Sequence, residues 1–208
     1  SGAGTDVIKV RGVPRLCGGS YAVIPDQIEA GTFMVAAAAT RGDVTIKNII
    51  PKHLECISRK LTEMNVKVVE FDDYIRVIGS GIIESASVKT MPYPGFPTDM
   101  HPQMAVLMSL ADGTSRVTEN IWESRFKYVD ELRKLGAQIA VTGNVATIEG
   151  GVQLLGAPIR SCDLRAGAAM IIAGLVASGT TVIEEIEFIE RGYENIIEKF
   201  RGLGANIK

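Results

Sequence analysis

Apolar and polar positions follow an order that recurs three times along the chain. Each copy begins with a segment that is apolar on every side; these are residues 27–40, 104–111 and 165–178. After a glycine comes a short strand pattern, at residues 44–49, 115–120 and 180–186. An amphipathic pattern closes each copy, at residues 53–64, 127–135 and 193–200. A unit of this length cannot bury its apolar surfaces alone, so the three copies are expected to share one core.

The apolar segments predict helices that are buried on every side, because a helix without a polar face has no surface to offer to water. Glycines within these segments, Gly31, Gly167 and Gly174, indicate close helix packing. The amphipathic segments predict outer helices, and strands are also expected at 73–78 and 145–149. The pattern therefore predicts an α/β fold with buried helices inside, and with sheets and amphipathic helices outside. We expect one domain over residues 1–208, with pseudo-repeats at about 21–79, 86–150 and 157–208.

Composition narrows the function classes. The 208 residues are 46% hydrophobic with a formal net charge of −2, which gives no electrostatic reason to expect nucleic-acid binding. The longest apolar stretch, residues 166–176, is too short to span a membrane. His53 and His101 lack partners at metal-ligand spacing, so neither a metal nor another cofactor is expected. The three cysteines are widely spaced and favour a reducing cytoplasm over a disulfide framework; they are Cys17, Cys56 and Cys162.

Three aspartates lie near the starts of the apolar segments. Asp26 and Asp163 directly precede such segments, where a short acidic side chain caps a helix. Asp99 ends the stretch 91–99, whose three prolines restrict the backbone. That stretch is either a stiff connection or a device that holds one carboxylate at the rim of a site.

Arginines occupy the joints between the other elements. Arg125 and Arg191 stand at matching positions between a strand and an outer helix, and Arg165 begins the third apolar segment. A cation at a helix N-terminus opposes the helix dipole, so Arg165 needs a partner. Asp163, two residues earlier, is one candidate, and a phosphate or carboxylate ligand is the other. Cys162 stands beside Asp163, which disfavours a reactive thiolate, and it is interpreted as a packed residue.

Five segments together resemble the C-terminal half of the bacterial UDP-N-acetylglucosamine enolpyruvyl transferases. They occur in family order at residues 18–32, 96–100, 123–126, 163–166 and 191–194. The resemblance implies an inside-out α/β barrel domain, in which three repeated units surround buried helices. It implies transfer of the enolpyruvyl group of phosphoenolpyruvate to the 3-hydroxyl of UDP-N-acetylglucosamine, the committed step of peptidoglycan synthesis.

The resemblance also implies roles for single residues. Asp99 matches the carboxylate proposed to accept the proton of the sugar hydroxyl, and Ile121 matches a position that contacts the UDP-sugar. Arg125, Arg165 and Arg191 match cations that face phosphoenolpyruvate. They are expected to hold its carboxylate and phosphate and to stabilise charge as phosphate departs.

In this family the active site lies between two domains, and the chain resembles only one. It lacks the family's reactive-cysteine loop, a neighbouring arginine and an N-terminal Lys-Asn pair. Residues 1–6 resemble the crossing between domains. We therefore expect a fragment that is inactive alone and whose partner is the missing N-terminal domain. The alternatives are a shikimate-pathway enolpyruvyl transferase, an RNA 3′-phosphate cyclase, a non-catalytic anion-binding module and a purely structural domain.

Overall fold

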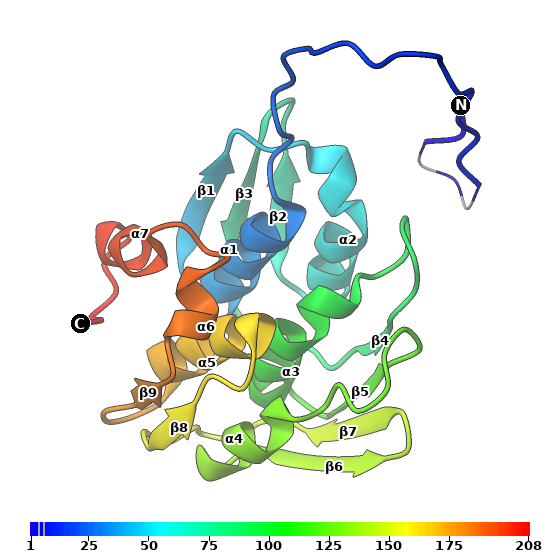
Figure 1. Cartoon of the computed structure of the whole chain (residues 1–208). Helices are drawn as coiled ribbons and strands as arrows, with labels where there is room; N and C mark the ends of the chain where they lie inside the picture. The colour runs from blue at the N-terminus through cyan, green and yellow to red at the C-terminus, as the bar shows by residue number, and fades with distance from the viewer. Residues whose placement is uncertain (4, 6) are drawn as a thin grey trace.

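Three inner helices form the centre of the computed structural model, which describes residues 1–3, 5 and 7–208. They are α1 (Gln27–Ala39), α3 (His101–Leu110) and α5 (Leu164–Val176). Each of the three contacts the other two, and Figure 1 shows them side by side in the middle of the molecule. Residues 30–39 of α1, 101–109 of α3 and 166–173 of α5 are buried. The prediction of three buried, mutually packed helices is confirmed.

The second inner helix begins three residues earlier than predicted. Pro102 lies in its first turn, where the missing N–H removes no helical hydrogen bond. A single turn of 3₁₀ helix, η2 (Thr98–Met100), leads directly into α3. Because of this continuity, Asp99 is attached to the end of a buried helix rather than to a free loop.

Three sheets lie outside the inner helices. The first has the order β1-β3-β2 and is antiparallel; its strands are β1 (Asp43–Lys47), β2 (Lys67–Glu70) and β3 (Tyr74–Ile78). The second has the order β4-β5-β7-β6; its strands are β4 (Ser87–Lys89), β5 (Thr114–Thr118), β6 (Gln138–Thr142) and β7 (Val145–Glu149). In the third, β8 (Pro158–Arg160) pairs in parallel with β9 (Val182–Glu184). The strands predicted at 73–78 and 145–149 are present as β3 and β7.

Register sets which side of the middle sheet faces the core. Val117 of β5 lies opposite Ala146 of β7, and both side chains are fully buried. Their strand neighbours Arg116 and Thr147 point the other way, as the two-residue period of a strand requires. β5 ends at Thr118, so residues 119 and 120 leave the predicted strand and enter the loop described below.

Short helices cover parts of the outside. They are α2 (Glu55–Glu63), which follows η1 (Pro51–Leu54), and α4 (Tyr128–Lys134), α6 (Glu187–Glu190) and α7 (Ile196–Gly202). The outer helix predicted at 193–200 is present as α7, but it begins three residues later than predicted. Asn195 has a left-handed φ of 49°, which separates α6 from α7 and delays the start of the last helix to Ile196.

Gly167 shows why a glycine lies inside an inner helix. A Cβ atom there would stand 2.2 Å from Ser161 Oγ and 2.4 Å from Ile189 Cγ1. These distances confirm the close packing that the sequence indicated at this position.

The segment before α1 differs from the rest. Residues 7–25 form no helix or strand and are exposed, and they extend away from the helices in Figure 1. The interpretation of residues 1–6 as a domain crossing includes residues 4 and 6, which lie outside the described residues. Within the described part of the chain, no helix combines the length and apolarity needed to cross a membrane.

Candidate active site

Asp99 lies between two arginines that come from distant parts of the chain. Arg125 Nη2 donates to Asp99 Oδ1 over 3.1 Å, and Arg165 Nε donates to Asp99 Oδ2 over 3.1 Å. The side chain of Asp99 is 35% exposed, whereas those of Arg125 and Arg165 are 23% and 14% exposed. Asp99, at the end of the proline-rich stretch, is therefore a partly exposed carboxylate between two cations, and its place at the rim of a site stays a prediction.

Asp163 joins this group mainly as a helix cap. Its Oδ1 accepts from the backbone N–H of Arg165 and Ala166, and its Oδ2 lies 3.7 Å from Arg125 Nη1. The side-chain partner of Arg165 is thus Asp99 rather than Asp163, because capping turns the Asp163 carboxylate toward the helix backbone. We call Asp99, Arg125, Asp163 and Arg165 the carboxylate–arginine cluster. Asp26 caps α1 in the same way, through the N–H of Ile28.

Each arginine of the cluster keeps one nitrogen without a hydrogen-bond partner among the described residues. These buried nitrogens are Arg125 Nε and Arg165 Nη1. An unsatisfied buried donor is unfavourable by about 1–3 kcal/mol, and more when it is charged. The cluster therefore holds unused hydrogen-bond donors, which an anion can reach only if the atoms that cover them move.

The aromatic ring of Tyr193 packs against the guanidinium group of Arg165. The guanidinium carbon lies 5.4 Å from the centre of the Tyr193 ring, and the Tyr193 hydroxyl lies 3.0 Å from Thr32 Oγ1. Gln103 Nε2 donates to the same Thr32 oxygen. Burial lowers the pKa of Arg165, but Tyr193 and Asp99 more than offset this and raise it. Burial raises the pKa of Tyr193, and the negative charge of Asp26 adds to this rise.

Arg191 is close in sequence to Tyr193 but has a different contact. The guanidinium carbon of Arg191 lies 5.6 Å from the centre of the Phe188 ring, and Arg191 is exposed. The structure brings Asp99, Arg125 and Arg165 together, whereas it records no contact from Arg191 to any of them among the described residues. The place of Arg191 in the same site stays a prediction.

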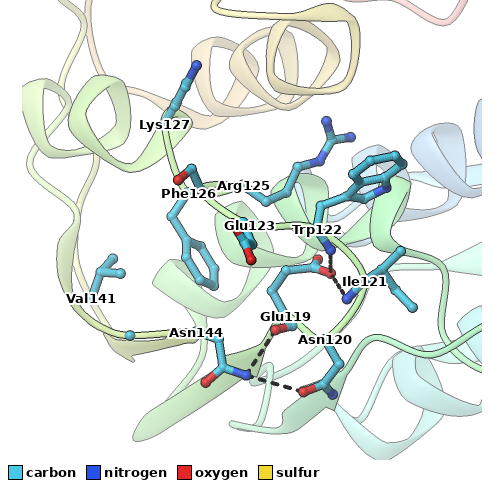
Figure 2. A pocket seen from close by; sticks show the side chains of 12 residues that line it. Glu119, Asn120, Ile121, Trp122, Glu123, Arg125, Phe126, Lys127, Val141 and Asn144 are labelled. Atoms are coloured by element: carbon cyan, nitrogen blue, oxygen red, sulfur yellow. Dashed lines mark hydrogen bonds between the residues drawn. The ribbon is translucent and has the colours of Figure 1, made fainter.

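Ile121 lies on the loop that follows β5 and also carries Arg125. A cavity of about 720 Å³ opens over this loop, and Figure 2 shows the side chains around it. It is lined by residues 119–127 together with Val141, Gly143 and Asn144. Ile121 and Arg125 line the cavity, and Arg125 connects it to Asp99, which is not one of its lining residues.

A buried polar group that the sequence pattern did not predict lies next to this loop. Glu119 accepts hydrogen bonds from Thr90, Thr98 and two backbone amides, and its Oε2 lies 3.3 Å from His101 Nε2. Burial raises the pKa of Glu119, but these hydrogen bonds outweigh it and lower the pKa. Burial lowers the pKa of His101 to about 4, so the imidazole is neutral near pH 7. His101 Nδ1 lies 3.1 Å from the Tyr128 hydroxyl.

The sequence contains a signal for this polar group and for the contacts among Tyr193, Thr32 and Gln103. Thr32, His101 and Gln103 are polar residues in helices that are otherwise apolar on every side, and all three are fully buried. A buried polar side chain needs a partner, so such positions indicate a hydrogen-bond network. The partners themselves come from other segments and could not be read from spacing.

Comparison with known proteins identifies the family. The family model described as EPSP synthase (3-phosphoshikimate 1-carboxyvinyltransferase) matches residues 1–200. The chain belongs to this family. Solved structures agree with the α/β fold: the enolpyruvyl transferase NikO from Streptomyces tendae has a TM-score of 0.81 and 27% identity, over 89% of this chain and 44% of that one. An EPSP synthase from Acinetobacter baumannii has a TM-score of 0.75 at 22% identity, over 87% of this chain and 46% of that one, and shows the fold alone.

Curated relatives within the family are more similar and carry a different name. A UDP-N-acetylglucosamine 1-carboxyvinyltransferase of Clostridium botulinum is 58% identical over 99% of this chain and 49% of its own length. One from Desulfofundulus thermocisternus is 57% identical over 99% of this chain and 85% of its own length. These identities confirm the resemblance found in the sequence and favour it over the shikimate-pathway alternative. The chain spans about half the length of the Clostridium relative.

Proposed function

We propose that this chain is one half of an enzyme that transfers the enolpyruvyl group of phosphoenolpyruvate to the 3-hydroxyl of UDP-N-acetylglucosamine, with release of phosphate. The observation that carries the proposal is the carboxylate–arginine cluster, in which the Asp99 and Asp163 carboxylates meet two arginines that have unsatisfied buried nitrogens. The names of the relatives at 58% and 57% identity support the choice of substrates. The reaction would serve peptidoglycan synthesis.

Asp99 is proposed to take the proton of the sugar hydroxyl. The hydroxyl oxygen then bonds to the carbon of the enolpyruvyl group that carried the phosphate, and the bond from that carbon to the phosphate oxygen breaks. A carboxylate within hydrogen-bond reach of the hydroxyl can act as such a base. The two arginine contacts use one hydrogen bond on each Asp99 oxygen, so each oxygen keeps a lone pair that can accept from the sugar hydroxyl.

The arginines are proposed to receive phosphoenolpyruvate. Arg125 and Arg165 would bind the carboxylate or phosphate of the ligand in place of the Asp99 carboxylate. The oxygens of either group can accept paired hydrogen bonds from a guanidinium. Arg191, exposed at the end of α6, would join them and stabilise the charge that develops on the departing phosphate. Ile121, in the wall of the 720 Å³ cavity, would contact the UDP-sugar.

The rest of the site is proposed to come from a second half. The chain spans 49% of the Clostridium relative, and catalysis needs positioned groups on both sides of the substrates. The partner is therefore the missing N-terminal domain of the same enzyme, and residues 1–208 form one domain with three pseudo-repeats. The shared core of the inner helices supports this division. A cytoplasmic location fits the three free cysteines.

The test is phosphate release from phosphoenolpyruvate in the presence of UDP-N-acetylglucosamine. We expect no turnover from the purified chain alone and turnover when it is joined to the missing half, which we call the two-half enzyme. Shikimate 3-phosphate is the control acceptor, and its use in place of the UDP-sugar would contradict the proposal. Turnover by the chain alone would contradict the two-half site.

A non-catalytic anion-binding module is the second candidate, because the unsatisfied arginine nitrogens alone account for binding. Calorimetry with phosphoenolpyruvate and with the UDP-sugar separates the two. Binding of the first ligand together with an inactive two-half enzyme would favour the module.

A further inference from the structure

Glu119 is a buried carboxylate that makes no hydrogen bond or ion pair with Arg125 or Asp99. It follows directly on β5, and its side chain is only 1% exposed. Its Oε1 accepts from the backbone N–H of Ile121 over 2.6 Å and of Trp122 over 3.0 Å, as the dashed lines in Figure 2 show. The loop that lines the cavity therefore folds back, so that two of its N–H groups bond to the carboxylate of its first residue.

The same carboxylate reaches two other segments. Thr90, which follows β4, donates its hydroxyl to Oε1 over 2.9 Å. Thr98 of η2 donates its hydroxyl to Oε2 over 2.7 Å. Thr98 directly precedes Asp99, and the loop held by Oε1 continues to Arg125. One buried group therefore connects the turn that carries the proposed base with the loop that carries one of its arginines.

The surroundings of Glu119 explain how a charge is tolerated there. His101 Nε2 lies 3.3 Å from Oε2, but it does not have hydrogen-bond geometry, and burial keeps the ring neutral. The charge of Glu119 is therefore balanced by hydrogen-bond donors rather than by a cation. A buried carboxylate with this arrangement is expensive to desolvate and is a poor source of stability alone. Its effect is geometric, because several short hydrogen bonds fix the directions of three segments at once.

We propose that Glu119 is a positioning residue for the transfer reaction, and that it orients Asp99 through Thr98 and the cavity loop through the N–H groups of Ile121 and Trp122. The proposal rests on the proposed function, because it assigns Asp99 the role of base. Glu119 touches no substrate in this scheme. Loss of the Thr98 contact leaves Asp99 present but less firmly oriented toward the sugar hydroxyl, which slows proton transfer without removing the arginines that bind phosphoenolpyruvate.

The experiment compares Thr98→Val with Thr114→Val in the two-half enzyme. Both changes preserve shape and remove a hydroxyl that donates to a glutamate over 2.7 Å, but Thr114 pairs with exposed Glu149 at the far end of β5. We expect Thr98→Val to lower kcat about tenfold, the usual scale for one hydrogen bond to a charged group, with the KM for phosphoenolpyruvate unchanged. Thr114→Val should leave kcat unchanged. Thr98→Ser, which keeps the hydroxyl, should recover most of the activity.

A second measurement does not need activity. Hydrogen exchange of the peptide that covers residues 97–101 is expected to be faster in Thr98→Val than in the parent 208-residue chain, and unchanged in Thr114→Val. Faster exchange in an enzyme without any transferase activity would reject the proposed function and leave the structural tie intact. Unchanged exchange, an unchanged kcat, or equal losses in the Thr98 and Thr114 variants would overturn the positioning role of Glu119.

Discussion

Replacement of Asp99 by asparagine is expected to change ligand binding and catalysis in opposite directions. In the structure, Asp99 occupies Arg125 and Arg165 through two contacts of 3.1 Å. An anionic ligand that binds the arginine nitrogens now paired with Asp99 must displace this carboxylate. The Asp99→Asn variant would keep the shape of the side chain and one acceptor oxygen but would remove the competing charge.

The size of the effect follows from the exposure of the cluster. Asp99 is 35% exposed, so solvent screens its pairs, and each contributes about 0.5–1 kcal/mol. A ligand that replaces both pairs therefore forgoes about 1–2 kcal/mol. Because the amide oxygen of asparagine retains a weaker hydrogen bond, roughly half of this is recovered, which corresponds to about two- to fivefold tighter binding. If Asp99 is the base, turnover should fall by about 10²–10⁴-fold at the same time.

Calorimetry of the 208-residue chain with phosphoenolpyruvate measures the first effect, and phosphate release by the two-half enzyme measures the second. Asp72→Asn is the matched control, because Asp72 is an exposed aspartate on the turn between β2 and β3. Unchanged or weaker binding by Asp99→Asn would refute the idea that Asp99 and the ligand share the arginines. Unchanged turnover would refute its role as base.

Three other outcomes are expected. Arg191→Ala in the two-half enzyme should lower kcat/KM, because the transition state loses roughly 3 kcal/mol of stabilisation. An unchanged kcat/KM would contradict the role of Arg191. His101 has a folded-state pKa of about 4, against an ordinary value of 6.5. Between these two pH values the unfolded chain binds more protons than the folded chain. The free energy of unfolding should therefore fall by about 3 kcal/mol from pH 7 to pH 4. Urea unfolding at both pH values should show this loss in the parent chain, and His101→Gln should remove it. Gly167→Ala should destabilise the chain by about 1–3 kcal/mol in urea unfolding, because its methyl group would overlap Ser161 and Ile189; an unchanged midpoint would refute that contact.

Much of the architecture could be predicted because burial leaves a mark on composition. Segments without a polar face predict helices α1, α3 and α5, and a short strand pattern at residues 145–149 predicts β7. The boundaries were less certain. The last outer helix begins three residues later than predicted, because the left-handed conformation of Asn195, and not a change in apolar period, decides where it begins.

The site was predicted only in part. The residue types at the joints indicated Asp99, Arg125 and Arg165, and the structure brings these three together. The residue types did not assign their partners: Arg165 pairs with Asp99 rather than with Asp163, and Arg191 lies against Phe188. Short-range capping satisfied Asp163, which released Arg165 for a partner from another repeat.

The sequence by itself determined the repeated order of elements, the burial of the inner helices and the residue types available at their ends. Local pattern is sufficient for these, because they depend on which faces of a segment can meet water. Only the tertiary structure decided that Asp99 meets Arg165, which is 66 residues away, and that Glu119 connects the Asp99 turn to the cavity loop. Such contacts depend on how the three inner helices pack against one another, and a linear spacing carries no information about that distance.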